Sequence, residues 1–302
     1  LYAVFSSLGQ CRPGITRAWW GLLLVLALLT WQRNEVWRDE FSLWSAAAIR
    51  APDVFRVQSN LGLALYERDE LEIARRVLKQ ALELNPRYGR TWSNMGMVYE
   101  ELGEYPAAEQ AYQKALELRP DLVGIHANLG RLYVGLGRYD EARAALDQAL
   151  ALDAQSVVAR TNLGLLHQRA GRLERAVREY ERVLALGPLT AEAYNNLGLA
   201  YQDLGRWGEA EDALRRAAER DSEDGAAEIN LQILRLRREG RAPIDIYEVL
   251  TRQYADRPEL WRKLATEYAA IGRVGEAIAA CRQLLVLDPR DQQALANLEK
   301  LL

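Results

Sequence analysis

The stretch NLGRLYVGLGRYDEARAALDQALALDAQSVVARTNLG, residues 128–164, begins and ends with the same three letters. This tripeptide, once with Met in place of Leu, recurs every 34 residues, with its asparagine at Asn60, Asn94, Asn128, Asn162 and Asn196. A fixed period of roughly 20 to 50 residues indicates an array of small supersecondary units rather than one domain around a single core. The period therefore decides the fold class before any other feature is considered.

Other residues recur in phase with the tripeptide. If Asn60 is position 6 of the first unit, position 8 is glycine and position 20 is alanine in five successive units. Position 24 is Leu or Tyr, and position 32 is Pro in three of these units. The apolar residues fall at helical spacing, a further glycine between the two apolar stretches suits a turn with positive φ, and proline ends the second helix. Each unit therefore predicts two helices, which bury their apolar faces only by stacking on neighbouring units.

These positions together resemble the tetratricopeptide repeat (TPR), and the match is specific because so many of them agree in phase. The resemblance implies an all-α fold, a TPR α-solenoid in which helix-turn-helix repeats form a right-handed superhelix. It also implies that the first helix of each repeat faces a concave groove.

We expect the array to cover residues 55–302, as about seven repeats followed by a C-terminal capping helix at 292–302. The sixth unit, 225–257, keeps the asparagine but loses the glycine, and Pro243 falls near the start of its second helix, where proline is tolerated. Residues 33–54 are predicted to be a junction containing half a repeat.

The N-terminal residues 1–32 depart from the pattern and are predicted to be a membrane segment. Its helix, at about 18–31 (AWWGLLLVLALLTW), carries no charge and has tryptophans near both ends, which suit the two membrane interfaces. As a helix it is roughly 21 Å long, short of a hydrocarbon core of about 30 Å. A cleaved signal peptide and a buried soluble helix are therefore alternatives. No small-x-small cleavage site follows the run, so we expect a transmembrane helix.

Two observations bear on the setting of this helix. Arg12 and Arg17 precede it, and the positive-inside tendency puts the repeats on the non-cytoplasmic side. The junction at 30–53, followed by repeats, resembles the C-terminal part of transmembrane-and-TPR O-mannosyltransferase-type membrane glycosyltransferases. That resemblance implies a non-catalytic region belonging to a longer membrane enzyme.

The sequence gives little sign of chemistry. The net charge of -3, from 39 basic and 42 acidic residues, argues against nucleic acid as the main partner. Cys11 and Cys281 are too few for a metal or disulfide framework, and His126 and His167 occupy positions that take packing aromatics in other units. No hydrolase, metalloprotease or phosphate-binding motif occurs. We therefore predict no catalytic residue, no metal site and no cofactor, and a protein that is not an enzyme.

Position 6 is the candidate binding position. It is asparagine in six successive units, Asn60, Asn94, Asn128, Asn162, Asn196 and Asn230. Packing does not require asparagine there, and an amide can both donate to and accept from the backbone of an extended peptide. The ladder resembles that of the O-GlcNAc transferase repeat domain, which implies a peptide-binding groove. The alternative is that asparagine is simply common at this position of TPR sequences.

The leading hypothesis is a membrane-anchored TPR scaffold that binds extended polypeptide segments or partner proteins in its concave groove. A second hypothesis is a substrate-presenting region of a membrane protein glycosyltransferase. A third is a self-assembling filament protein, suggested by the apolar C-terminal residues Leu298, Leu301 and Leu302.

Overall fold

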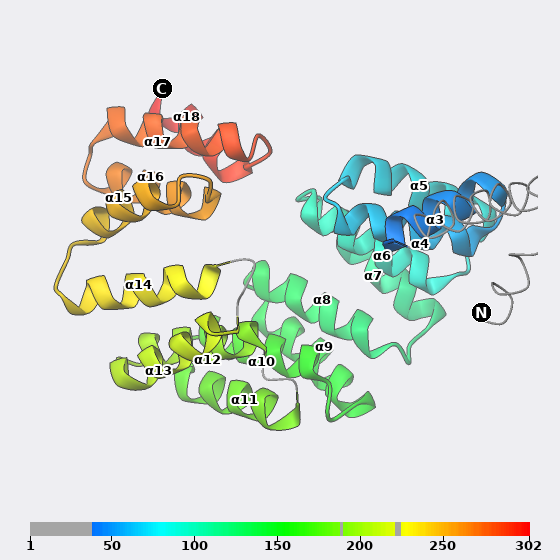
Figure 1. Ribbon diagram of the computed structural model, residues 1–302. Helices are drawn as coiled ribbons and strands as arrows, with labels where there is room; N and C mark the ends of the chain where they lie inside the picture. The colour runs from blue at the N-terminus through cyan, green and yellow to red at the C-terminus, as the bar shows by residue number, and fades with distance from the viewer. Residues whose placement is uncertain (1–37, 188–189, 221–224) are drawn as a thin grey trace, which may run out of the picture. The chain divides into compact units, whose positions relative to one another are not determined.

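The computed structural model describes residues 38–187, 190–220 and 225–302, and these ranges form sixteen α-helices and no strand (Figure 1). The predicted all-α TPR solenoid is confirmed at this level. The chain divides into two compact units, which meet in sequence at Ala154 and Gln155. The predicted transmembrane helix at 18–31 lies outside the described residues. Among the described helices, none is long and apolar enough to cross a bilayer.

The first unit contains helices α3 to α9 and the second contains α10 to α18. The first unit's helices are α3 (Glu40–Arg50), α4 (Phe55–Glu67), α5 (Leu71–Leu84), α6 (Gly89–Glu101), α7 (Tyr105–Leu118), α8 (Val123–Gly135) and α9 (Tyr139–Leu152). The second unit's helices are α10 (Val157–Arg169), α11 (Leu173–Leu186), α12 (Ala191–Asp203), α13 (Trp207–Ala218), α14 (Ala226–Arg238), α15 (Pro243–Gln253), α16 (Pro258–Ala270), α17 (Val274–Leu287) and α18 (Gln292–Leu301). Within each unit every helix packs on the next, and in the first unit the first helices of successive repeats, α4, α6 and α8, also touch one another.

The glycine of the repeated tripeptide is explained by close helix packing inside each repeat. A Cβ added at Gly96 would lie 2.6 Å from Cε1 of Tyr112, and one added at Gly130 would lie 2.6 Å from Cγ of Leu146. Such distances are far shorter than a carbon–carbon contact allows. The position-24 side chain of the second helix therefore rests directly on the backbone of the first.

The turn between the two helices of a repeat also needs a particular backbone. Gly103 ends α6 with φ of 75°, and its N–H donates to the carbonyl of Glu100 at 3.0 Å. Asp69 occupies the same place in the preceding repeat with φ of 59°, and it is the one non-glycine residue with positive φ among the described residues. The left-handed conformation is less favourable for aspartate than for glycine, although aspartate tolerates it better than most residues with a Cβ.

The sixth repeat, α14 and α15, is irregular. Gln232 stands where the five regular repeats have glycine, and its Nε2 donates to the Tyr254 hydroxyl at 2.9 Å. Helix α15 has 11 residues, against 14 in α11, and Pro243 is its first residue, as predicted. The side chain of Gln232 therefore ties α14 to the C-terminal end of α15.

Candidate functional site

In the first unit, the predicted asparagines line one hollow on the first-helix face. This hollow, called here the polar hollow, has a volume of about 250 Å³ and is formed by α4, α6 and α8. Asn60, Asn94 and Asn128 all line it, together with Ser59, Ser93 and Arg90. Apolar contact comes from Leu63, Leu122 and Ile125. The repeat period thus brings three amides, one from each repeat, to a single concave surface.

The three amides differ in what they already bind. Nδ2 of Asn94 donates to the Ser59 carbonyl at 3.3 Å, and the Thr91 hydroxyl donates to Oγ of Ser59 at 3.0 Å. Both bonds tie α6 to α4. Asn60 and Asn128 are half-buried, and their side chains make no hydrogen bond to any described residue. Two whole amides and the carbonyl of a third therefore face the polar hollow with hydrogen-bonding capacity to spare.

The asparagines of the second unit are not equivalent. Nδ2 of Asn230 donates to Oδ1 of Asn195 at 2.8 Å, whereas Asn196 is half-buried with no side-chain hydrogen bond among the described residues. Asn162 is only 6% exposed, so a peptide would reach little of it. The expectation that packing does not need these residues is wrong at Asn94 and Asn230, because each binds the preceding first helix through position 5 of that helix.

Glu100 of α6 and Arg131 of α8 form an ion pair on the first-helix face. Glu100, at 11% side-chain exposure, forms an ion pair with Arg131 at 2.9 Å and accepts a hydrogen bond from the Tyr112 hydroxyl at 3.0 Å. Burial raises the pKa of Glu100 above its usual range, although Arg131 and Tyr112 oppose the shift. Arg131 is therefore already bound to Glu100. Arg90 is the exposed cation in the lining of the polar hollow.

A recurring side-chain hydrogen bond, which the sequence analysis did not predict, joins the first helix of four repeats to the loop that precedes it. A side chain at position 4 reaches back six residues to a backbone carbonyl: Gln58 to Pro52 at 2.9 Å, Trp92 to Pro86 at 2.8 Å and Trp261 to Ala255 at 2.9 Å. His126 lies at the same position, with Nε2 3.0 Å from the carbonyl oxygen of Pro120. The sequence signal that could have predicted this hydrogen bond is a side chain able to donate, six residues after the loop residue, as in these four units.

The remaining candidate groups are buried. His167 is 5% exposed and Cys281 is 1% exposed, both in packing positions as expected, and burial raises the pKa of the Cys281 thiol. In the described ranges, no cluster of three or more His, Cys, Asp or Glu side chains is arranged to hold a metal ion.

Comparison with known proteins agrees with the repeat pattern. A tetratricopeptide repeat model matches residues 53–121, 87–155 and 122–187, and a second tetratricopeptide repeat model matches 161–225. Together these matches run from residue 53 to 225, which is more than half of the 302 residues. No curated protein matches the sequence.

Several solved structures share the fold. A thermophilic TPR protein of Thermus thermophilus is 21% identical, with a TM-score of 0.57, over 61% of this chain and 100% of that one. A tetratricopeptide repeat protein of Parabacteroides merdae is 18% identical, with a TM-score of 0.55, over 93% and 98%. A chain of the APC/C hetero-tetramer Cut9–Hcn1 is 19% identical, with a TM-score of 0.56, over 86% of this chain, which spans 45% of that longer one.

None of these matches extends the resemblance to O-mannosyltransferase-type enzymes, which has no support beyond the junction residues. The matched positions are those of the repeats themselves, and the structure shows why the repeats need them. The chain belongs to the tetratricopeptide repeat family.

Proposed function

We propose that this protein is a TPR scaffold that holds extended polypeptide segments on the first-helix face of its repeats. The observation that carries the proposal is the convergence of Asn60, Asn94 and Asn128 on one hollow of about 250 Å³. An extended strand exposes backbone N–H and C=O groups that its own chain leaves unpaired, and amide side chains satisfy both kinds of group. Binding of this kind reads the backbone and tolerates many side chains.

The hydrogen bonds of the three asparagines determine which of them should be substituted to test peptide binding. Asn94 helps to join α6 to α4, so its removal would confuse loss of binding with loss of packing. Asn60 and Asn128 carry no such bond, and the Asn60→Ala/Asn128→Ala variant removes both free amides. Gln80 and Gln148 are exposed amides on the second helices α5 and α9, so Gln80→Ala/Gln148→Ala is the matched control.

The test uses the full chain, immobilised, and a phage library of random peptides of about 12 residues, each roughly 40 Å long when extended. We expect enrichment on the wild type and on the Gln80→Ala/Gln148→Ala control, and at least a severalfold loss on Asn60→Ala/Asn128→Ala. Circular dichroism should show the same helicity for all three. Equal enrichment on the two double variants would refute the role of the asparagines.

We further propose that residues 18–31 anchor the scaffold in a membrane, with the repeats on the non-cytoplasmic side. The support is the uncharged run AWWGLLLVLALLTW with its terminal tryptophans. Carbonate extraction of membranes from expressing cells, with and without residues 1–32, tests the anchor. Release of the full chain by carbonate would contradict it, and protease protection of the repeats tests the side.

A second candidate function rests on the junction at 30–53, which resembles that of membrane glycosyltransferases with TPR regions. In that case the same groove would present acceptor polypeptides to a catalytic membrane domain encoded upstream. Sequencing upstream of residue 1 distinguishes the candidates, because a start codon close to that residue excludes the second one.

A further inference from the structure

The second unit has a concave hollow of a different chemical character. This apolar hollow has a volume of about 330 Å³ and is formed by α12, α14, α15 and α16. Its walls include Leu199, Ile229, Ile233 and Leu260, with Tyr247 and the single asparagine Asn230. The polar hollow, in contrast, is lined by three asparagines and two serines. The apolar hollow therefore suits a hydrophobic side chain rather than a bare backbone.

The irregularity of the sixth repeat accounts for this difference. Every residue that lines the polar hollow comes from a first helix or its cap, whereas Tyr247 of the apolar hollow belongs to a second helix, α15. Gln232 replaces the glycine against which the second helix normally packs, and its amide is held by the hydroxyl of Tyr254. Tyr247 is 6% exposed and belongs to one buried cluster with Ile229 and Leu260, so it forms part of the floor of the apolar hollow.

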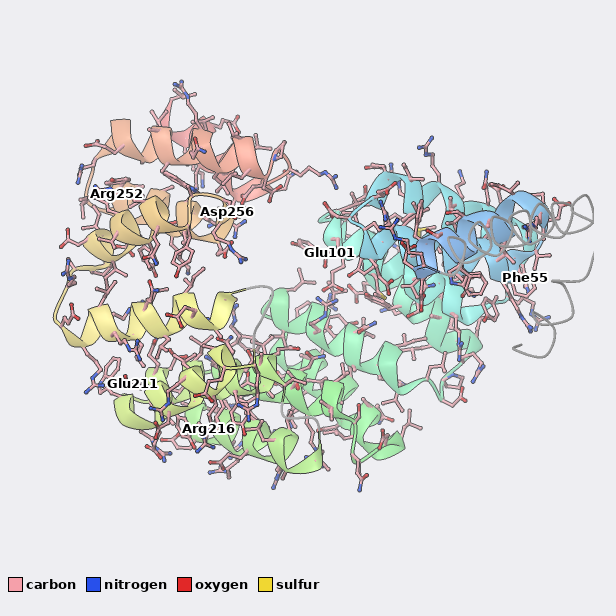
Figure 2. The ribbon with its side chains drawn as sticks, in the orientation of Figure 1. Phe55, Glu101, Glu211, Arg216, Arg252 and Asp256 are labelled. Atoms are coloured by element: carbon pink, nitrogen blue, oxygen red, sulfur yellow. The ribbon has the colours of Figure 1, made fainter. Side chains whose placement is uncertain are left out.

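The charges around the apolar hollow are unbalanced. Arg237 and Lys263 are exposed and line it, and neither forms an ion pair with a described residue. Glu259 is the only carboxylate in the lining. The neighbouring arginines behave differently: Arg235 and Arg238 both pair with Glu211 of α13, labelled in Figure 2. The apolar hollow therefore has two cations available for a partner's carboxylate.

One polar atom at this site also lacks a partner. Oε1 of Gln202, in the lining, is buried and accepts no hydrogen bond from any described residue. Buried polar atoms are nearly always hydrogen-bonded in folded proteins, and an unpaired one calls for an explanation. An N–H group of a bound segment would supply the missing donor.

We propose that the apolar hollow is a polypeptide-binding site within the second unit, and that it takes a large aliphatic or aromatic side chain next to an Asp or Glu. The apolar side chain enters between Ile229, Ile233 and Leu260, and the adjacent carboxylate binds Arg237 and Lys263. The inference rests on the proposed function and adds to it the chemistry that the bound segment must carry.

The test uses the same full chain and the same phage library. We expect peptides enriched on the wild type to share a Leu, Ile, Phe or Met adjacent to an acidic residue. On Arg237→Glu/Lys263→Glu, whose changes lie on exposed side chains, the acidic residue should give way to Lys or Arg. Identical enriched sequences on both proteins, or sequences without the apolar–acidic pair, would overturn the proposal.

A second variant tests the apolar wall. Ile233→Asp should weaken the enriched peptides by about tenfold, a change equivalent to about 1.4 kcal/mol. Ile271→Asp, at a residue that is 58% exposed and outside the hollow, should leave them unchanged. If none of the enriched peptides depends on Ile233 while some depend on Asn60 and Asn128, this inference is overturned and the proposed function stands. No enrichment on the wild type would overturn both.

A second copy of this chain is the competing occupant. Size-exclusion chromatography with light scattering distinguishes it, since a self-associating chain would give a dimer that Ile233→Asp converts to monomer. That result, without enrichment of apolar–acidic peptides, would also overturn the proposal.

Discussion

Replacing Gly96 with alanine tests the packing that defines every regular repeat. The new methyl group would lie 2.6 Å from Cε1 of Tyr112, a ring that is fully buried. The ring cannot retreat easily, because its hydroxyl is held by Glu100, which is itself paired with Arg131. Relief of the clash must therefore come from movement of α7 away from α6.

The magnitude follows from two opposing effects. Alanine is about 1 kcal/mol better than glycine inside a helix, whereas overpacking a close contact costs about 1–3 kcal/mol and occasionally more. Gly124→Ala, in α8, adds the same methyl group where no atom lies within 4 Å, so it should be neutral or stabilising. We expect Gly96→Ala to be less stable than Gly124→Ala by about 1–3 kcal/mol.

The assay is urea unfolding followed by helical circular dichroism, with midpoints compared because repeat arrays can unfold in more than one step. The Tyr112→Ala background supplies the decisive control. Removing the ring removes the clash, so Gly96→Ala should cost nothing further there, and the double-mutant cycle isolates the contact. An equal effect of Gly96→Ala with and without the ring would refute the packing argument.

Three further predictions concern the first unit. Asp69→Gly should raise the urea midpoint, because relief of the left-handed strain at φ of 59° is worth about 1 kcal/mol. Trp92→Phe should lower it by about 0.5–1.5 kcal/mol, because the indole N–H no longer reaches the Pro86 carbonyl; a pH-independent loss of this size in urea unfolding is the expected result. Hydrogen bonds from Arg138 lower the pKa of Glu109 below its ordinary 4.5, so its stabilising effect is present above that pH and is lost as the pH falls through the folded value. Glu109→Gln should therefore flatten the loss of thermal stability between neutral pH and acid, and an unchanged slope would contradict this.

The sequence predicts the repeats well because each recurring residue reports a local constraint. Gly96 and Tyr112 lie 16 residues apart within one unit, and the turn at Gly103 requires its φ of 75° whatever surrounds it. Five copies of the same constraint reinforce one another. Asp69 shows that the turn also forms with aspartate, a residue that tolerates positive φ less well than glycine.

The site was predicted less completely, because its asparagines are equivalent in sequence and not in structure. The two bonded amides, Asn94 and Asn230, both reach position 5 of the preceding repeat, 35 residues earlier. There Ser59 offers its carbonyl to Asn94, and Asn195 offers its side chain to Asn230. A search for polar pairs at this spacing would have found the Asn195–Asn230 bond. It would have missed the bond to Ser59, because a backbone carbonyl has no sequence signature.

The two hollows indicate how a repeat protein can acquire selectivity without losing its fold. In a regular repeat the position-24 side chain of the second helix packs on the glycine at position 8, and the first-helix face presents the amides that we propose to bind an extended backbone. At Gln232 this glycine contact is absent, and the neighbouring hollow is lined by Tyr247, aliphatic side chains and two cations, Arg237 and Lys263, that form no ion pair with a described residue. An irregular repeat weakens only its own packing and its contacts with the two adjacent repeats, because the stability of such arrays is a sum of nearest-neighbour terms. A departure from the repeat pattern therefore costs the array little, and it is the place where discrimination between bound segments is most easily built.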